Sequence, residues 1–439
     1  MKFEKGKVIT KEKTYFVEEL ELLKFISDKK ELILLLTENN IESLIAYISA
    51  INSSHAVMLL HLKGNNEFLE RIIDNYLPKW IIGLKERKGY IYNNGILTRE
   101  SSVTIHIHRE LALLLNTSGT TGSQKFVRLS YENLQSNAQS IIEYLEIDEN
   151  ERAIMHLPLS YSYGMSIVNS HLLAGASILL TDESVIEKSL WEFVQKQKAT
   201  SLAGVPFTYQ MLHRIGFMQM ELPHLKVLTQ AGGRLNEKLV KLFGEYAQQH
   251  NKRFYIMYGQ TEASPRISYV PYDKVLEKSG TIGISIPGGQ LSIEGELNEL
   301  VYRGGNVMMG YAESVNDLAK GNELEGVLHT GDTATMDEDG YFTITGRIKR
   351  FIKLFGLRIN LDDVEKKLEE IFHIPLACTG SDDKLIVAIE KVDKVGQVKE
   401  IIENLYKLHK TAYKVIVIDE IPRLANGKTN YTTLKELCL

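Results

Sequence analysis

A short segment near residue 120 combines the residue types that bind phosphate. Residues 111–115 are uniformly apolar, and residues 116–125, which read NTSGTTGSQK, hold two glycines, five hydroxyl side chains and one lysine. Backbone N–H groups and hydroxyls of such a turn can converge on phosphate oxygens, and the lysine adds positive charge. The sequence therefore predicts a phosphate-binding loop that precedes a helix capped near Ser130. Its candidate ligands are Thr117, Ser118, Gly119, Thr120, Thr121, Gly122 and Lys125.

The spacing of this loop differs from that of the Walker A loop of kinases. A Walker A loop has four residues between its glycines and continues with Gly-Lys-Ser/Thr. Here only two residues separate Gly119 from Gly122, and Gln124 precedes Lys125. A P-loop kinase is therefore disfavoured, and a plain turn of small residues is the other alternative for this segment.

Further segments carry glycine beside acidic, basic or aromatic residues. They read QAGGRL at 230–235, YGQTE at 258–262, NELVYRG at 298–304 with GY at 310–311, HTGD at 329–332, GRIK at 346–349 and PRLANGK at 422–428. In this order, these segments and the phosphate loop resemble the motifs of the adenylate-forming superfamily of acyl-CoA synthetases, luciferases and peptide-synthetase adenylation domains. The resemblance extends from about residue 31 to residue 428.

This resemblance implies that the chain binds ATP and Mg²⁺ and joins a carboxylic acid to AMP with release of pyrophosphate. The catalytic candidates are Lys428, Glu262 and Thr261. Glu262 would hold the metal ion, and Lys428 would place positive charge where negative charge develops. Thr261 would donate to the α-phosphate and Asp332 would accept from the ribose hydroxyls. The nucleotide-binding candidates outside the phosphate loop are Gly232, Gly233, Tyr258, Gly259, Asp332, Arg347 and Lys349.

The resemblance also implies a second reaction, transfer of the acyl group to a thiol. Coenzyme A and the phosphopantetheine of an acyl carrier protein are both candidate acceptors. Members of the superfamily swing a small C-terminal domain about a hinge between the two reactions, and Lys349 stands at the hinge position. The chain departs from the family pattern after the phosphate loop, where Gln124 replaces proline.

The acid-binding candidates are Tyr161 and Gly204, of which Tyr161 stands where many relatives have histidine. Tyr163, Met165 and Phe207 are further residues that could shape an apolar pocket. Residues 153–180 contain no Asp or Glu to pair with a substrate ammonium, and a buried unpaired ammonium costs several kcal/mol. We therefore expect a small carboxylic acid without an α-amine.

The composition indicates which partners and which cellular compartment to expect. Of 439 residues, 44% are apolar and 24% charged, and the net charge of −5 disfavours a nucleic-acid partner. The two cysteines, Cys378 and Cys438, lack metal-ligand spacing, which favours a reducing compartment. The N-terminus lacks an apolar signal segment, and no apolar run reaches membrane-spanning length. We expect a cytoplasmic protein without membrane insertion.

The periodicity predicts an α/β fold. Strand, helix and strand patterns follow one another at 31–37, 41–48 and 55–61, which indicates parallel sheets with crossover helices. Beyond residue 280, glycine-punctuated alternation predicts a small antiparallel barrel or sheet, followed by a small α+β domain. We expect a large N-terminal adenylation domain of stacked αβ subdomains with a small β-barrel-like part at 1–348, and a smaller mobile C-terminal lid domain at 349–439.

Two histidines alternate in the apolar segment 103–108. A strand there would place His106 and His108 on one face, where packed or solvated side chains are more common than a metal site.

An ATP-dependent acid–thiol ligase is the favoured function, working through an acyl adenylate. A non-catalytic nucleotide-binding protein that retains the fold is the alternative, and the presence of Lys428, Glu262 and Asp332 together speaks against it.

Overall fold

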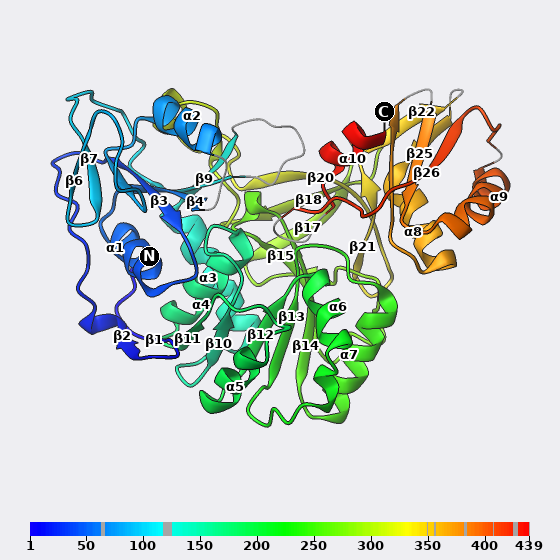
Figure 1. Cartoon of the computed structure of the whole chain (residues 1–439), viewed down its shortest axis with the longest axis horizontal. Coiled ribbons are helices and arrows are strands. Elements are labelled where there is room, and N and C mark those ends of the chain that lie inside the picture. The colour runs from blue at the N-terminus through cyan, green and yellow to red at the C-terminus, as the bar shows by residue number, and fades with distance from the viewer. Residues whose placement is uncertain are drawn as a thin grey trace. The chain divides into compact units, whose positions relative to one another are not determined.

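The computed structural model describes all residues except 63–65, 117–124, 349, 355–356, 382–383, 407, 425–428 and 439. The chain divides into two compact units (Figure 1). Unit 1 contains the described residues of 1–117, 123–291 and 302–328, and unit 2 contains those of 292–301 and 329–439. The domain boundary expected between residues 348 and 349 stays a prediction.

Unit 1 contains an eight-stranded sheet in the order β19-β9-β8-β4-β3-β5-β7-β6. Its strand β3 is buried along its whole length, because both faces of the sheet are covered. Ile33 and Leu35 pack in one cluster with helix α1, while Leu32, Leu34 and Leu36 pack in another with α2. The strands are β3 (Leu32–Thr37), β4 (Ala56–His61), β5 (Trp80–Ile82), β6 (Tyr90–Asn93), β7 (Ile96–Arg99), β8 (Leu111–Asn116), β9 (Phe126–Ser130) and β19 (Gly310–Ala312).

A second sheet of unit 1 has nine strands in the order β16-β15-β14-β13-β12-β10-β11-β1-β2. Strands β1, β11, β10, β12, β13 and β14 are parallel, so their carboxyl ends meet at one edge. Strand β15 then runs antiparallel to β14. The strands are β1 (Lys7–Ile9), β2 (Thr14–Phe16), β10 (Arg152–Met155), β11 (Ser177–Leu180), β12 (Ser201–Gly204), β13 (Val227–Gln230), β14 (Arg253–Gly259), β15 (Arg266–Val270) and β16 (Ile284–Ser285).

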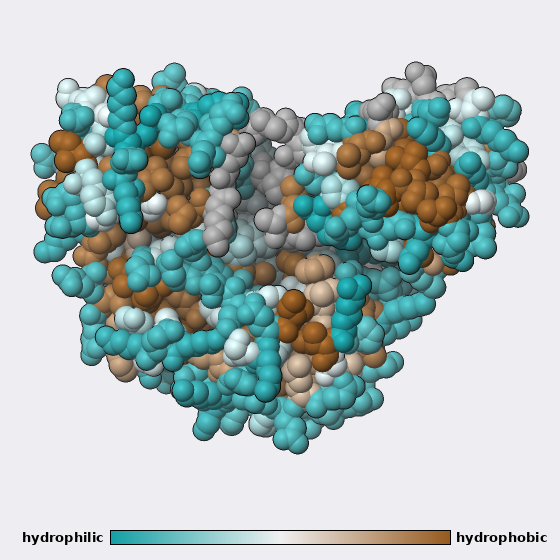
Figure 2. Space-filling view, in the orientation of Figure 1, coloured by the Kyte–Doolittle hydropathy of each residue, from teal (hydrophilic) through white to brown (hydrophobic). Residues whose placement is uncertain are grey.

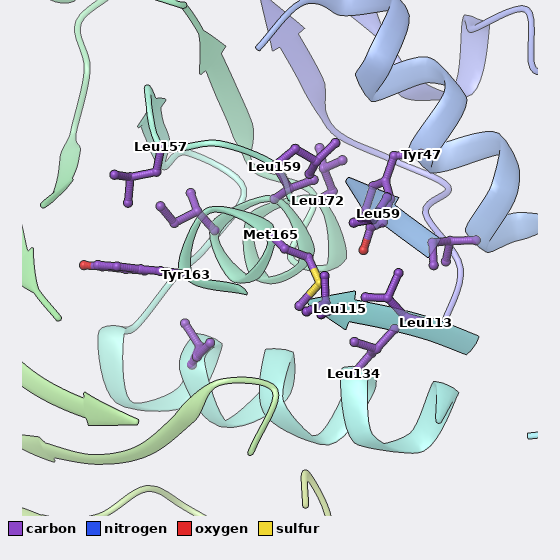
Figure 3. Packing of buried hydrophobic residues seen from close by; sticks show 14 of the residues in the cluster. Tyr47, Leu59, Leu113, Leu115, Leu134, Leu157, Leu159, Tyr163, Met165 and Leu172 are labelled. Carbon is purple, nitrogen blue, oxygen red and sulfur yellow. The ribbon is translucent and has the colours of Figure 1, made fainter. Parts of the chain in front are cut away.

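Helices α1, α3 and α4 share the largest apolar cluster with residues of both sheets (Figure 1). In Figure 3, Met165 of α4 points toward Leu115 of β8, whereas Tyr163 projects away from these residues. Met165 is therefore buried in the apolar core, whereas Phe207 is exposed. The helices of unit 1 are α1 (Ile41–Asn52), α2 (Asn66–Tyr76), α3 (Tyr131–Leu145), α4 (Ser162–Leu173), α5 (Lys188–Lys196), α6 (Pro206–Arg214) and α7 (Glu237–Gln249).

Unit 2 contains three helices, small sheets and the larger part of a four-stranded sheet whose strands β17, β18 and β20 begin or end in unit 1. The four-stranded sheet has the order β17-β18-β20-β21, and a three-stranded sheet β24-β25-β26 packs apolar side chains on both of its faces. The elements are β17 (Gly289–Glu294), β18 (Glu299–Gly304), β20 (Val327–Met336), β21 (Phe342–Arg347), β22 (Phe351–Leu354), β23 (Leu357–Asn360), α8 (Leu361–Phe372), β24 (Leu376–Ser381), β25 (Lys384–Ile389), α9 (Val395–Tyr406), β26 (Tyr413–Val417) and α10 (Tyr431–Cys438).

Apolar residues gather on the face of unit 2 that Figure 2 shows. Exposed apolar side chains of this unit include Ile371, Val392, Leu405, Val417 and Leu437. Within the described parts of the chain, no helix has the length and apolar content needed to cross a bilayer.

The expected α/β class is confirmed, and one local expectation is wrong. Residues 102–108 form no strand; the segment is held by the bond from His108 N to Leu318 O, while Ile105 and Ile107 pack against the core. The phosphate loop leads into β9 before the helix begins, because Phe126–Ser130 pairs with β8. The helix start itself is confirmed: Ser130 caps α3 in a reciprocal box with Asn133.

Candidate active site

The YGQTE segment lies in a tight turn at the carboxyl end of β14. Glycine is required at its second position, since a Cβ on Gly259 would lie 1.8 Å from the carbonyl oxygen of Pro265. A single 3₁₀ turn, Thr261–Ala263, then leads toward β15. Met308 N donates to the carbonyl of Glu262 at 2.9 Å, which fixes the backbone below its carboxylate.

Glu262 belongs to a cluster that joins three distant segments of the sequence. The hydroxyl of Tyr311 donates to Glu262 Oε1 at 2.9 Å. The ammonium nitrogen of Lys125 lies 3.5 Å from the centre of the Tyr311 ring, a cation–π contact. Burial, together with the nearby Glu262 carboxylate, raises the pKa of Tyr311, so its hydroxyl stays a donor. The phosphate-loop lysine and the expected metal ligand thus both contact Tyr311.

Arg128 holds the strand that carries Tyr311. Its guanidinium is fully buried; Nε donates to Tyr311 O at 3.1 Å, and Nη2 donates to Met309 O at 3.3 Å and pairs with Glu323. Burial lowers the pKa of Arg128, and Glu323 opposes this shift. These hydrogen bonds to the backbone hold the strand from which the Tyr311 ring faces Lys125.

Thr261 lies next to the N-terminal end of α4, and Tyr161 lies next to the turn that follows β13. Thr261 Oγ1 lies 3.2 Å from Ser162 Oγ. A Cβ on Gly232 would lie 2.4 Å from the Tyr161 hydroxyl, so glycine allows this approach. Gln230 is buried and donates from Nε2 to Gly233 O at 2.8 Å, which closes the turn. Burial raises the pKa of Tyr161 to about 12, so at neutral pH it is a neutral phenol.

Three other predicted residues lie near these turns. Gln260 Nε2 donates to the Tyr258 hydroxyl at 3.1 Å. A Cβ on Gly204 would lie 2.9 Å from side-chain carbons of α6, and one on Gly233 would lie 3.1 Å from Pro206 Cγ. Close packing by itself is therefore a sufficient reason for glycine at residue 204.

Unit 2 contains a separate pair of predicted residues. Asp332 and Arg347 are partners in the β20–β21 register, and Arg347 Nε donates to Asp332 Oδ1 at 3.1 Å. Asp332 is 3% exposed. Glu299 Oε1 accepts from Gly331 N at 2.9 Å and so shapes the turn before Asp332. The pairing places a buried carboxylate in a fixed orientation.

Several predicted residues lie outside the described part of the chain. They are Thr117, Ser118, Gly119, Thr120, Thr121, Gly122, Lys349 and Lys428. For them the roles proposed from sequence stay predictions.

Four residues of the site region escaped the sequence analysis as functional candidates. Ser162, Arg128, Tyr311 and Arg266 each take their place through contacts with remote segments, although Tyr311 belongs to the GY motif at 310–311 and was given no role there. Arg266 carried one local signal: it is a charged residue at the start of the apolar strand β15.

The described residues include no group of three His, Cys, Asp or Glu side chains that could hold a metal ion. Mg²⁺ is commonly held by one or two carboxylates together with substrate phosphates and water. Glu262, whose Oε1 is oriented by Tyr311, is a suitable single carboxylate.

Two stacked α/β sheets, a glycine-bearing turn with an oriented glutamate and a lysine beside it define an adenylate-forming protein. Residues 22–312 match the family model described as AMP-binding enzyme, and the chain belongs to this family.

The relatives include ligases that form acyl-CoA. The chain is 27% identical over 368 residues to a medium-chain fatty-acid–CoA ligase of Escherichia coli, covering 79% of this chain and 64% of the ligase. It is 26% identical to an indoleacetate–CoA ligase of Aromatoleum aromaticum, covering 74% and 67%. The chain thus spans less than two thirds of the length of the first of these relatives. The o-succinylbenzoate–CoA synthetase of Bacillus subtilis, solved with ATP and magnesium, has a TM-score of 0.75 at 19% identity, covering 98% of this chain and 97% of that one.

Proposed function

We propose that this chain is an AMP-forming ligase that activates a carboxylic acid with ATP and transfers the acyl group to a thiol. In the first step a carboxylate oxygen attacks the α-phosphorus, and pyrophosphate leaves as the acyl adenylate forms. In the second step the thiol attacks the acyl carbonyl, AMP leaves, and a thioester forms. The observation that carries the proposal is the cluster of Lys125, Tyr311 and Glu262 beside Thr261.

Each residue of this cluster has a task in the first step. Bound Mg²⁺ would offset the repulsion between the anionic acid and the triphosphate. Glu262 would hold the ion through its carboxylate, and Tyr311 orients that carboxylate. Lys125 would neutralise phosphate oxygens once its ammonium leaves the aromatic face. In unit 2, Asp332 would accept from the ribose hydroxyls, with Arg347 fixing its orientation.

Coenzyme A is the acceptor that we favour, because the relatives named above are CoA ligases. The phosphopantetheine arm of an acyl carrier protein offers the same thiol chemistry and is the alternative acceptor. Offering both acceptors with an acid that supports activation, and separating the thioesters, decides between them.

The test of the first step is exchange of labelled pyrophosphate into ATP, with a panel of acids. Glu262→Gln keeps an oxygen for the Tyr311 hydroxyl and removes the charge. We expect exchange to fall by about 10²–10³-fold, the usual effect of losing a charge-stabilising group. Glu192→Gln, an exposed change on α5, is the matched control and should retain full activity.

Two outcomes would contradict the proposal. Formation of ADP in place of AMP would indicate a kinase. ATP binding without exchange for any acid would favour the alternative, a nucleotide-binding protein that retains the fold without catalysis.

A further inference from the structure

Unit 1 contains a small cavity, and Tyr163 and Arg266 are among its lining residues. Its lining residues come from α3, α4, β10 and the segment before it, β12, β13 and the start of β15, and its volume is about 30 Å³. With about 10–15 Å³ needed for one water, the cavity has room for two waters or for one small polar group.

Arg266 brings a positive charge to this cavity. The residue is 3% exposed, and its guanidinium carbon lies 4.3 Å from the centre of the Tyr163 ring. The guanidinium shares a hydrogen bond with the Tyr144 hydroxyl, but its Nε atom has no hydrogen-bond partner, and no ion pair among the described residues includes it. A buried cation without a counter-charge is costly by several kcal/mol. The cavity is therefore suited to an anion.

The other polar groups of the lining already have partners. Tyr163 donates to Thr229, and Ser166 and Ser170 donate to carbonyls of α4. Glu151 also lines the cavity, but it precedes β10, whereas Arg266 pairs with Gly259 at the carboxyl end of β14. These two charges thus stand at opposite ends of the strands.

We propose that the acid carries a second carboxylate and that Arg266 binds it in this cavity as the specificity-determining residue. This inference rests on the proposed function. The centre of the Tyr163 ring is 6.3 Å from that of Tyr161, the residue expected beside the reacting carboxylate. A short dicarboxylic acid would place one carboxylate beside Tyr161 and the other beside Arg266. Arg266 also repels an ammonium, in agreement with an acid that lacks an α-amine.

The test compares three acids with the same five-carbon chain in the pyrophosphate exchange assay. Glutarate carries the second charge, glutaramate replaces it with a neutral amide, and valerate replaces it with a methyl group. For the wild-type protein we expect kcat/KM for glutarate to exceed that for either analogue at least tenfold. Arg266→Met should lose this preference and accept valerate as well as glutarate, and Arg266→Lys should keep part of it.

Arg253→Met is the matched control, because Arg253 begins β14 and pairs with the exposed Glu146. Its acid preference should equal that of the wild type. A wild-type protein that activates valerate as well as glutarate would overturn the inference and leave the proposed function intact, even if Arg266→Met does not fold. Equal losses for all three acids in Arg266→Met would assign Arg266 to the reacting carboxylate or to the fold, which also overturns it. Absence of exchange with every acid would instead contradict the proposed function.

Discussion

At the scale of single residues, Tyr311 links the two charges of the candidate phosphate site. Its hydroxyl donates to Glu262, and its ring faces the Lys125 ammonium. One side chain therefore orients a carboxylate and holds a cation close to it without a direct ion pair. An incoming triphosphate would compete for Lys125, because a phosphate offers a full negative charge where the ring offers a quadrupole.

Tyr311→Phe separates these two roles. The ring under Lys125 remains, and the bond to Glu262 is lost; a hydrogen bond to a charged group contributes about 1.5–3 kcal/mol. We expect roughly a tenfold or larger loss in kcat/KM of pyrophosphate exchange and a higher Mg²⁺ requirement. Tyr90→Phe, which removes a bond to Pro78 O far from the cluster in sequence, is the control. Unchanged Mg²⁺ dependence would show that Tyr311 does not orient the metal ligand.

At the scale of elements, helix α4 connects the candidate site with the core. Every residue from Ser162 to Leu172 is buried, as expected for a helix enclosed between two sheets. Its first turn carries Ser162 and Tyr163, and its last turn carries His171. His171 Nδ1 donates to Ile167 O at 2.9 Å, and burial lowers its pKa to about 4 although a helix C-terminus favours a cation.

The buried His171 makes stability depend on pH. Between pH 6.5 and 4 the unfolded chain binds more protons than the folded one, so the free energy of unfolding falls as the pH falls through this window. The contribution of His171 is about 2–3 kcal/mol. We expect His171→Gln to show a shallower fall in urea unfolding between pH 7 and 4.5. Residual dependence remains because burial also lowers the pKa of His156 to about 4.

His213→Gln serves as the control, because the side chain is exposed on α6. Its pH profile should follow that of the wild type. A profile of His171→Gln that parallels the wild type would mean that the protonation of this side chain does not govern the stability of unit 1.

At the scale of the whole molecule, the chemistry proposed here has two half-reactions and the chain has two compact units. The expected hinge residue Lys349 and the catalytic candidate Lys428 both follow residue 348 in sequence. If the C-terminal domain serves the two reactions in different orientations, a backbone restriction at the hinge should affect them unequally.

Lys349→Pro tests this prediction. Proline fixes φ and removes a backbone donor, so it restricts rotation there. We expect pyrophosphate exchange within about twofold of the wild type and thioester formation at least tenfold slower. Lys349→Ala, which removes the charge without restricting the backbone, is the matched control. Equal loss in both half-reactions would remove the support for a two-orientation scheme.

The sequence by itself determined the α/β class, several strands of both large sheets and the family, because apolar periodicity and glycine-bearing turns are local properties. It also identified Glu262, Lys125 and Asp332 as candidates from the order of motifs. Only the tertiary structure decided that Tyr311 joins Glu262 to Lys125, that Met165 faces the core, and that Arg266 lines a cavity with its Nε atom unpartnered. The physical reason is that burial and ion pairing depend on which remote segments contact one another. Residue spacing along the chain does not predict those contacts.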